Sequence, residues 1–107
     1  MGGFPKLVLQ SVDEGLAKVM GEDTAKAVKF YVDPSIAAKD PDRFITSIRK
    51  MFGKGTQTIE MRILDSLYSK VGLKLTNLED SDFAQYVEEA KRQYVHRILA
   101  EEEPPKF

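Results

Sequence analysis

A Gly-Lys-Gly-Thr string at residues 53–56 is the first stretch whose residue types could do chemistry. A phosphate-binding P-loop needs glycine, four residues and then Gly-Lys-Ser/Thr, between a strand and a helix, so that backbone amides surround the phosphates. Here Gly53-Lys54 is followed by Gly55, and Ile48 stands where the motif requires its first glycine. The preceding residues also have a helical pattern. The sequence therefore predicts no nucleotide site.

The same junction is closer to the turn of a helix-turn-helix motif, because two apolar-faced segments are joined by a short glycine-containing turn. Arg49 stands where a small residue is expected, and Lys54 and Arg62 stand where apolar ones are. The alternative interpretation is a pair of antiparallel core helices with a solvated basic edge. If DNA binds here, three polar residues would face the duplex and five cations would contact phosphates: Thr56, Gln57 and Thr58, with Arg43, Arg49, Lys50, Lys54 and Arg62.

The remaining reactive residue types form no convincing catalytic or metal-binding set. His96 is the only histidine and there is no cysteine, so a transition-metal site and thiol chemistry are not expected. Glu79, Asp80 and Asp82 group before a helical segment without the spacing of a calcium-binding loop, and their charges favour a helix N-terminus. We therefore expect no enzyme activity, no cofactor and no metal.

Composition sets the broad class of the protein. The 107 residues suffice for one domain, and a net charge of −1 gives no general attraction to nucleic acid or to anionic membranes. No apolar run is long enough to span a bilayer, and the absence of cysteine favours a cytoplasmic location. Frequent Lys, Arg and Glu with a single Asn lean toward a thermophilic source.

Apolar spacing near 3.6 residues and helix-ending residues predict an all-α domain of about five helices. Ser11 and Glu14 have the spacing of a capping box, which places the first helix start near Val12, although Gly15 weakens that helix. Asp40 followed by Pro41 predicts a capped third helix that ends at Gly53. The expected helices cover about 12–20, 24–32, 41–52, 55–71 and 81–100, with "DPSIAAKD" as a loop and "LKLTNLED" as a connection.

One continuous core should join these helices, because none of them can bury its apolar face alone. Residues 1–11 form an expected N-terminal arm, 12–100 the helical domain and 101–107 a flexible C-terminal tail. Apolar residues in the arm either seal the core or contact a partner. Tyr31 and Met51 are also expected on inward faces. The expected core centre is Leu16, Val28, Phe44, Ile48, Phe52, Ile59, Ile63, Leu67, Phe83 and Val87.

Four stretches together resemble an archaeal family, the Nitrosopumilus output domain: "VDEGLAKVMGED", "AVKFYVD", "PDRFITSIRKMFGKGTQTIEMRILDSLYSKVGL" and "DFAQYVEEAKRQY". The most specific part is Phe52-Gly53-Lys54-Gly55 with Ile59-Glu60 and Lys70-Val71-Gly72. The resemblance implies a small helical output module and supplies no catalytic residues. The segment "DPSIAAKD" departs from the longer polar connection of that family. The leading expectation is an archaeal regulatory or interaction module that binds a protein partner or forms a homodimer, with DNA binding as the alternative.

Overall fold

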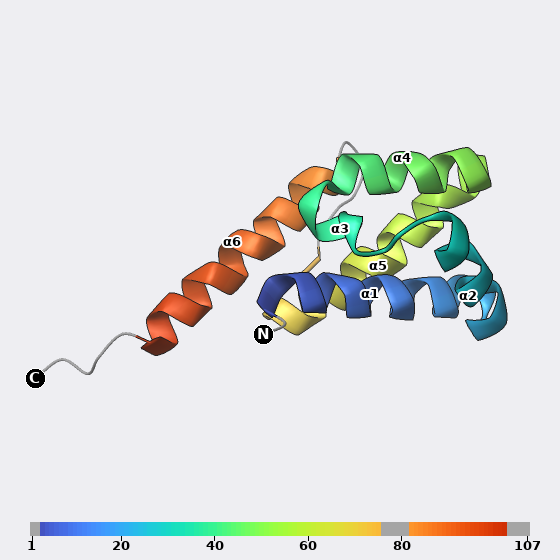
Figure 1. The fold of residues 1–107 in the computed structure, drawn as a ribbon. Helices are drawn as coiled ribbons and strands as arrows, with labels where there is room; N and C mark the ends of the chain where they lie inside the picture. Colours follow the sequence, from blue (N-terminus) through green and yellow to red (C-terminus); the bar gives the residue numbers. More distant parts are fainter. Residues whose placement is uncertain (1–2, 76–81, 103–107) are drawn as a thin grey trace, which may run out of the picture.

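Five helices of ten or more residues follow one another along the described part of the chain, residues 3–75 and 82–102, in the computed structural model (Figure 1). A four-residue helix and a 3-10 turn complete the order, and no strand occurs in these ranges. The expected all-α class and single helical core are confirmed. The elements are α1 (Gly3–Met20), α2 (Glu22–Tyr31), α3 (Ile36–Lys39), α4 (Pro41–Phe52), η1 (Gly53–Gly55), α5 (Thr56–Val71) and α6 (Phe83–Glu102).

Helix α4 has the bounds that local signals predict. The Asp40 carboxylate accepts a hydrogen bond from the backbone N–H of Arg43 at 3.2 Å, and Pro41 occupies the first helical position. At the other end Gly53 has a φ of 54°, a conformation that side chains disfavour and glycine accepts. Helix α5 then begins at Thr56, as expected. From this junction α5 turns back and runs at an angle to α4 (Figure 1).

The predicted start of the first helix was wrong, because α1 begins at Gly3 and includes most of the expected arm. Ser11 is no cap: it lies inside the helix, and its hydroxyl donates to the Leu7 carbonyl at 2.7 Å. Glu14 instead accepts hydrogen bonds from Lys70 and Ser66 of α5. Phe4 and Val8 are buried in the core, so the arm seals the core, the first of the two expected roles.

Helices α1 and α5 form the most extensive contact between described elements, and Gly15 lies at their closest approach. A Cβ atom at position 15 would lie 2.8 Å from the backbone nitrogen of Ile63. The glycine therefore lets two helix backbones touch, which explains its position in a helix that it otherwise weakens. All the expected core residues are buried except Phe52, which is partly buried, whereas Met51 is exposed.

Helix α2 and the segment after it differ from expectation in two ways. Tyr31 is 80% exposed, because the helix ends there and Val32 turns toward the core in its place. Phe30 beside it is 88% exposed. The segment "DPSIAAKD" is more than a loop, since α3 lies within it and Ala37 is fully buried.

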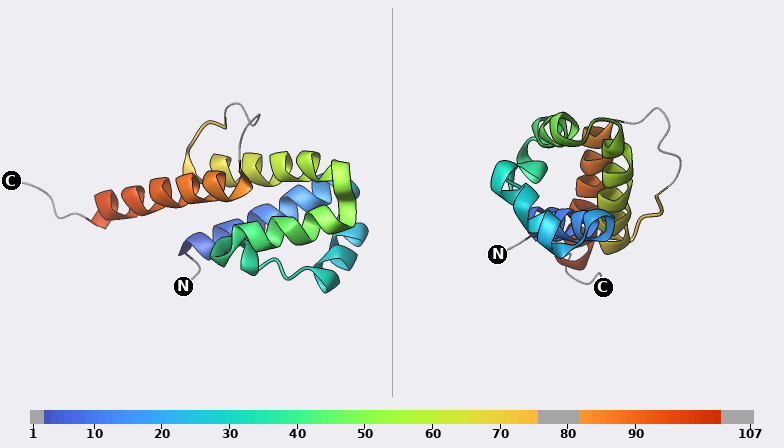
Figure 2. Two further views of the ribbon diagram at one scale, coloured as in Figure 1. Left: turned by 90° about the horizontal axis from the view of Figure 1, so that it is seen from above. Right: turned by 90° about the vertical axis from the view of Figure 1, so that its right-hand side faces the viewer.

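Helix α6 is attached to the rest of the protein along its first half. Phe83, Val87 and Ala90 are buried, and the ring of Tyr94 packs 5.8 Å from that of Phe4. About three quarters of the way along α6, Arg97 donates to the Val71 carbonyl at 2.9 Å and so caps the C-terminus of α5. Beyond this point α6 extends past the other helices (Figure 2). Of the expected tail, residues 101 and 102 belong to α6 and 103–107 lie outside the described residues.

Candidate functional site

The five cations that we considered for DNA contact lie on α4, η1 and α5, and all of them are exposed. Arg49 is already engaged, because its guanidinium lies 3.7 Å from the Glu60 carboxylate. Gln57 and Thr58 are exposed at the start of α5, as a contact with DNA requires. Arg49, Lys50 and Lys54 therefore form a basic edge at the junction, whereas Arg43 lies in the first turn of α4, at the other end of that helix, and Arg62 lies near the middle of α5. The exposed cations are Arg43, Arg49, Lys50, Lys54 and Arg62.

Thr56 does not face solvent, contrary to the DNA-binding prediction. Only 2% of the residue is exposed, and its hydroxyl has no hydrogen-bond partner among the described residues. The first turn of α5 packs against the body of the protein, so the side chain at its first position points inward. This leaves two polar candidates, not three, at the start of the helix.

Acidic groups also shape the electrostatics beside this basic edge. The neighbouring Asp82 carboxylate raises the pKa of Asp42, since two negative charges in proximity disfavour ionisation. Burial raises the pKa of Glu60 and outweighs the opposing effect of Arg49. Asp40 is used as a helix cap. The start of α4, at the end of the helix away from the junction, thus carries a partly self-repelling acidic group beside Arg43.

The other residues whose side chains could take part in catalysis or metal binding either have a structural role or face solvent. Burial and the nearby Glu89 raise the pKa of Tyr68 to about 12, and its hydroxyl donates to the Tyr86 carbonyl at 2.9 Å. His96 is exposed on α6. Across residues 3–75 and 82–102, no three His, Cys, Asp or Glu side chains are grouped to hold a metal ion. Glu79 and Asp80 of the predicted acidic group lie outside the described residues.

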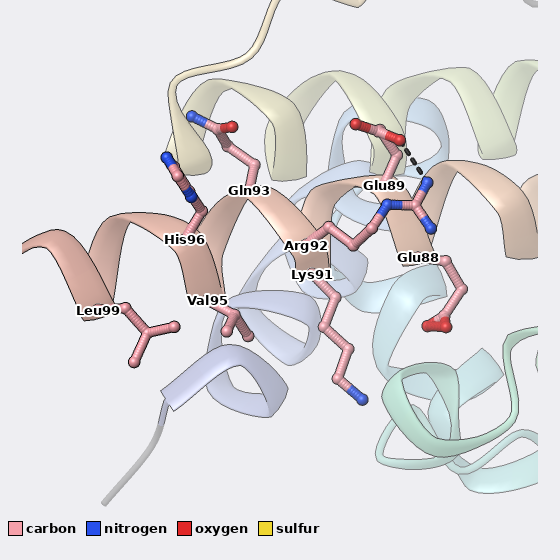
Figure 3. Close-up of a pocket in the computed structure, with 8 residues that line it drawn as sticks. All are labelled: Glu88, Glu89, Lys91, Arg92, Gln93, Val95, His96 and Leu99. Atoms are coloured by element: carbon pink, nitrogen blue, oxygen red, sulfur yellow. Dashed lines mark hydrogen bonds and ion pairs between the residues drawn. The ribbon is translucent and has the colours of Figure 1, made fainter.

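A shallow hollow runs along the outer side of α6, which we call the α6 face (Figure 3). Val95 is 44% and Leu99 62% exposed, one helical turn apart. Figure 3 shows both side chains projecting to the same side as Glu88 and Lys91, while Arg92 is paired with Glu89. Charged side chains thus lie beside the apolar pair, on the N-terminal side of Val95. The residues of the α6 face are Glu88, Glu89, Lys91, Arg92, Gln93, Val95, His96 and Leu99.

Sequence reasoning missed the α6 face because it followed only the inward stripe of the last helix. That stripe runs through Phe83, Val87, Ala90, Tyr94 and Ile98. Val95 and Leu99 are four residues apart and lie off the stripe, so they form a second apolar line on the same helix. This spacing of four residues could have indicated a second apolar face on the last helix.

Within the described ranges, no helix is sufficiently long and apolar to cross a membrane. Comparison of the chain with known proteins gave no information on its family or function. No family model matches the sequence, and neither the curated proteins nor the solved structures include a match. The resemblance to the archaeal output-domain family therefore stays a prediction.

Proposed function

We propose that this protein is a non-enzymatic interaction module that contacts another protein through the α6 face. The observation that carries the proposal is the exposed pair Val95 and Leu99 on a helix that extends past the body (Figures 2 and 3). Contact surfaces commonly combine an apolar centre with a charged rim. The α6 face has this composition, with Glu88, Lys91 and Arg92 beside the apolar pair.

The sequence resemblance favours a regulatory or output role within this proposal. The same resemblance favours an archaeal source. Residue usage favours a thermophilic source, and the lack of cysteine favours the cytoplasm. The structural part of the proposal is the α6 face, because its residues are the ones that a partner must cover.

A capture experiment with three immobilised proteins tests the proposal. Extract from the organism that encodes the chain is passed over the wild type, over Val95→Lys/Leu99→Lys and over Met61→Lys. Met61 is a matched control, because it is 43% exposed on α5, and Val95 is 44% exposed on α6. A partner retained by the wild type and the control but lost by the α6 variant supports the proposal. A partner retained equally by all three proteins contradicts it.

DNA binding is the second candidate, and the exposure of Arg49, Lys50 and Lys54 at the α4–α5 junction favours it. The logarithm of the association constant for random duplex DNA should then fall linearly with the logarithm of the salt concentration. The slope should be about −0.9 per phosphate contact. Replacing Lys50 and Lys54 together with Gln should reduce the magnitude of the slope by about one to two. Glu22→Gln/Asp23→Asn is not expected to change it, since both residues lie on α2. Lack of binding at about 50 mM salt, where non-specific contacts are strong, would exclude this candidate.

A further inference from the structure

Phe30 and Tyr31, at the C-terminal end of α2, are the two most exposed large hydrophobic side chains in the described part of the chain. Phe30 is 88% and Tyr31 80% exposed. Neither ring belongs to a ring pair among the described residues, and Val32 turns into the core after them. A large exposed apolar surface is informative, because burying it is favourable. Two free rings in succession therefore indicate a surface that a ligand covers.

The directions of the two rings indicate what kind of ligand can cover both. Both residues belong to α2, so their side chains leave the helix about 100° apart. A flat surface, such as a bilayer or the face of a globular protein, covers one of two such rings fully but not the other. The unpaired bases of a single nucleic acid strand turn independently about the backbone, and each stacks on one aromatic ring.

Free cations lie beside the rings and at the same end of the molecule. Lys26 is four residues before Phe30, so the two side chains are neighbours on the surface of α2. Lys50 and Lys54 lie at the α4–α5 junction, which shares this end of the molecule with α2, opposite the end to which α6 extends (Figures 1 and 2). Across residues 3–75 and 82–102, none of these three lysines has an ion pair.

The carboxylates near α2 leave a path for a strand from the rings to the junction. Glu22 and Asp23 lie in the first turn of α2, about two turns before the rings. Asp33 follows the rings, and its carboxylate accepts hydrogen bonds from the hydroxyl and the backbone N–H of Ser35. A strand that runs from Lys26 over the rings to the junction thus meets more positive than negative charge.

We propose that this end of the protein binds single-stranded nucleic acid. Two bases stack on Phe30 and Tyr31, and phosphates of the same strand contact Lys26, Lys50 and Lys54. This site is separate from the α6 face and goes beyond the proposed function. It also differs from the duplex-binding candidate, because the two rings have no part in that candidate.

Fluorescence anisotropy of a labelled oligothymidylate of about 12 nucleotides tests the proposal. With the purified full chain at about 50 mM salt, we expect a Kd in the range of about 1–100 µM. A duplex of the same length should bind more weakly, because its paired bases do not stack on the rings. The logarithm of the association constant should fall with the logarithm of the salt concentration, with a slope of about −0.7 per phosphate contact. Replacing Lys50 and Lys54 together with Gln should reduce the magnitude of this slope by about 1.4.

Two substitutions of one residue separate stacking from apolar burial. Phe30→Leu keeps an apolar side chain without a ring and should weaken binding at least about fivefold. Phe30→Tyr keeps the ring and should bind as the wild type does. Leu99→Ala is the matched control, because Leu99 is a 62% exposed apolar residue on α6, and it should not change binding. Helical circular dichroism and the melting temperature check that each variant stays folded.

Three outcomes overturn the proposal. They are a wild type that does not bind the oligothymidylate at about 100 µM protein, a Phe30→Leu variant that binds it as tightly as the wild type, and a duplex that binds at least as tightly as the single strand. Val95→Lys/Leu99→Lys should leave binding of the oligothymidylate unchanged. Because the proposed function rests on the α6 face, failure of this site leaves it standing, and loss of a captured protein partner in that α6 variant leaves this site standing.

Discussion

Replacing Gly15 with alanine has two opposing effects on stability, and the structure shows which of them is larger. Alanine inside a helix is favoured over glycine by about 1 kcal/mol. At this position, however, the new Cβ would lie 2.6 Å from Cγ1, 2.8 Å from N and 2.9 Å from Cα of Ile63. Two of these three atoms belong to the backbone of α5. A change of side-chain rotamer cannot move them, so the helices must separate.

The size of the separation sets the energetic cost. The Ile63 backbone nitrogen must retreat by about 0.6 Å to reach ordinary contact distance, and a gap of this size removes roughly a quarter of the attraction between facing atoms. Side chains along the same interface, among them Val12 and Leu16, lose contact as well. Overpacking of a core typically costs about 1–3 kcal/mol. Because backbone atoms clash, we expect a net loss near 2 kcal/mol, or roughly 10 °C in melting temperature.

Urea unfolding followed by helical circular dichroism measures this loss. Gly55→Ala is the matched control: a Cβ there would meet only the Phe52 Cβ at 3.9 Å, and φ is −71°. It should gain up to about 1 kcal/mol. Combining Gly15→Ala with Ile63→Ala should retain most of the penalty, since the backbone clash remains. A Gly15→Ala protein as stable as the wild type would refute the close approach of α1 and α5.

Three further predictions, with four substitutions, test the core and the electrostatics. Thr56→Val should raise stability by about 1 kcal/mol, because it removes a buried hydroxyl that has no partner among the described residues; a lower urea midpoint would contradict this. Ile63→Ala should cost about 2–5 kcal/mol, and Phe52→Ala less than Ile63→Ala, since Phe52 is only partly buried; equal losses would mean that Phe52 is buried more deeply. Hydrogen bonds from Lys70 and Ser66 lower the pKa of Glu14 below its ordinary value of 4.5. The contribution of Glu14 to the free energy of unfolding is therefore complete at pH values above 4.5, and it is lost as the pH falls through the pKa that Glu14 has in the folded protein. The difference in unfolding free energy between the wild type and Glu14→Gln, below about 1 kcal/mol for exposed pairs, should shrink in acid; a difference that grows in acid would contradict the pairing.

The accuracy of the sequence predictions depends on whether each signal is local. The ends of α4 were predicted correctly, because Asp40, Pro41 and Gly53 act through their own backbone neighbours. The start of α1 was not, because Ser11 and Glu14 have capping-box spacing for a different reason. Ser11 bonds within the helix, and Glu14 reaches α5, more than fifty residues away in sequence. A local pattern cannot reveal that its residues are used by distant partners.

The candidate site shows the same limit. Exposure of the five cations on α4, η1 and α5 was predictable, since long charged side chains rarely become buried. Burial of Thr56 was not, because it depends on how the first turn of α5 meets the body. Val95 and Leu99 carried a periodic signal, but periodicity alone cannot tell an inward apolar line from an exposed one. That distinction requires knowing where the body ends, and α6 continues beyond it (Figure 2).

The two halves of α6 therefore differ in what stabilises them. The first half is held by buried residues of the core, among them Phe83 and Val87, so its stability follows that of the domain. The second half depends on the Phe4–Tyr94 ring contact and the Arg97 hydrogen bond, followed by a stretch with apolar side chains in solvent. A contact that covers Val95 and Leu99 stabilises this half without changing the core. Under the proposed function, a partner bound to the α6 face would stabilise this end of the helix while the rest of the fold stays intact.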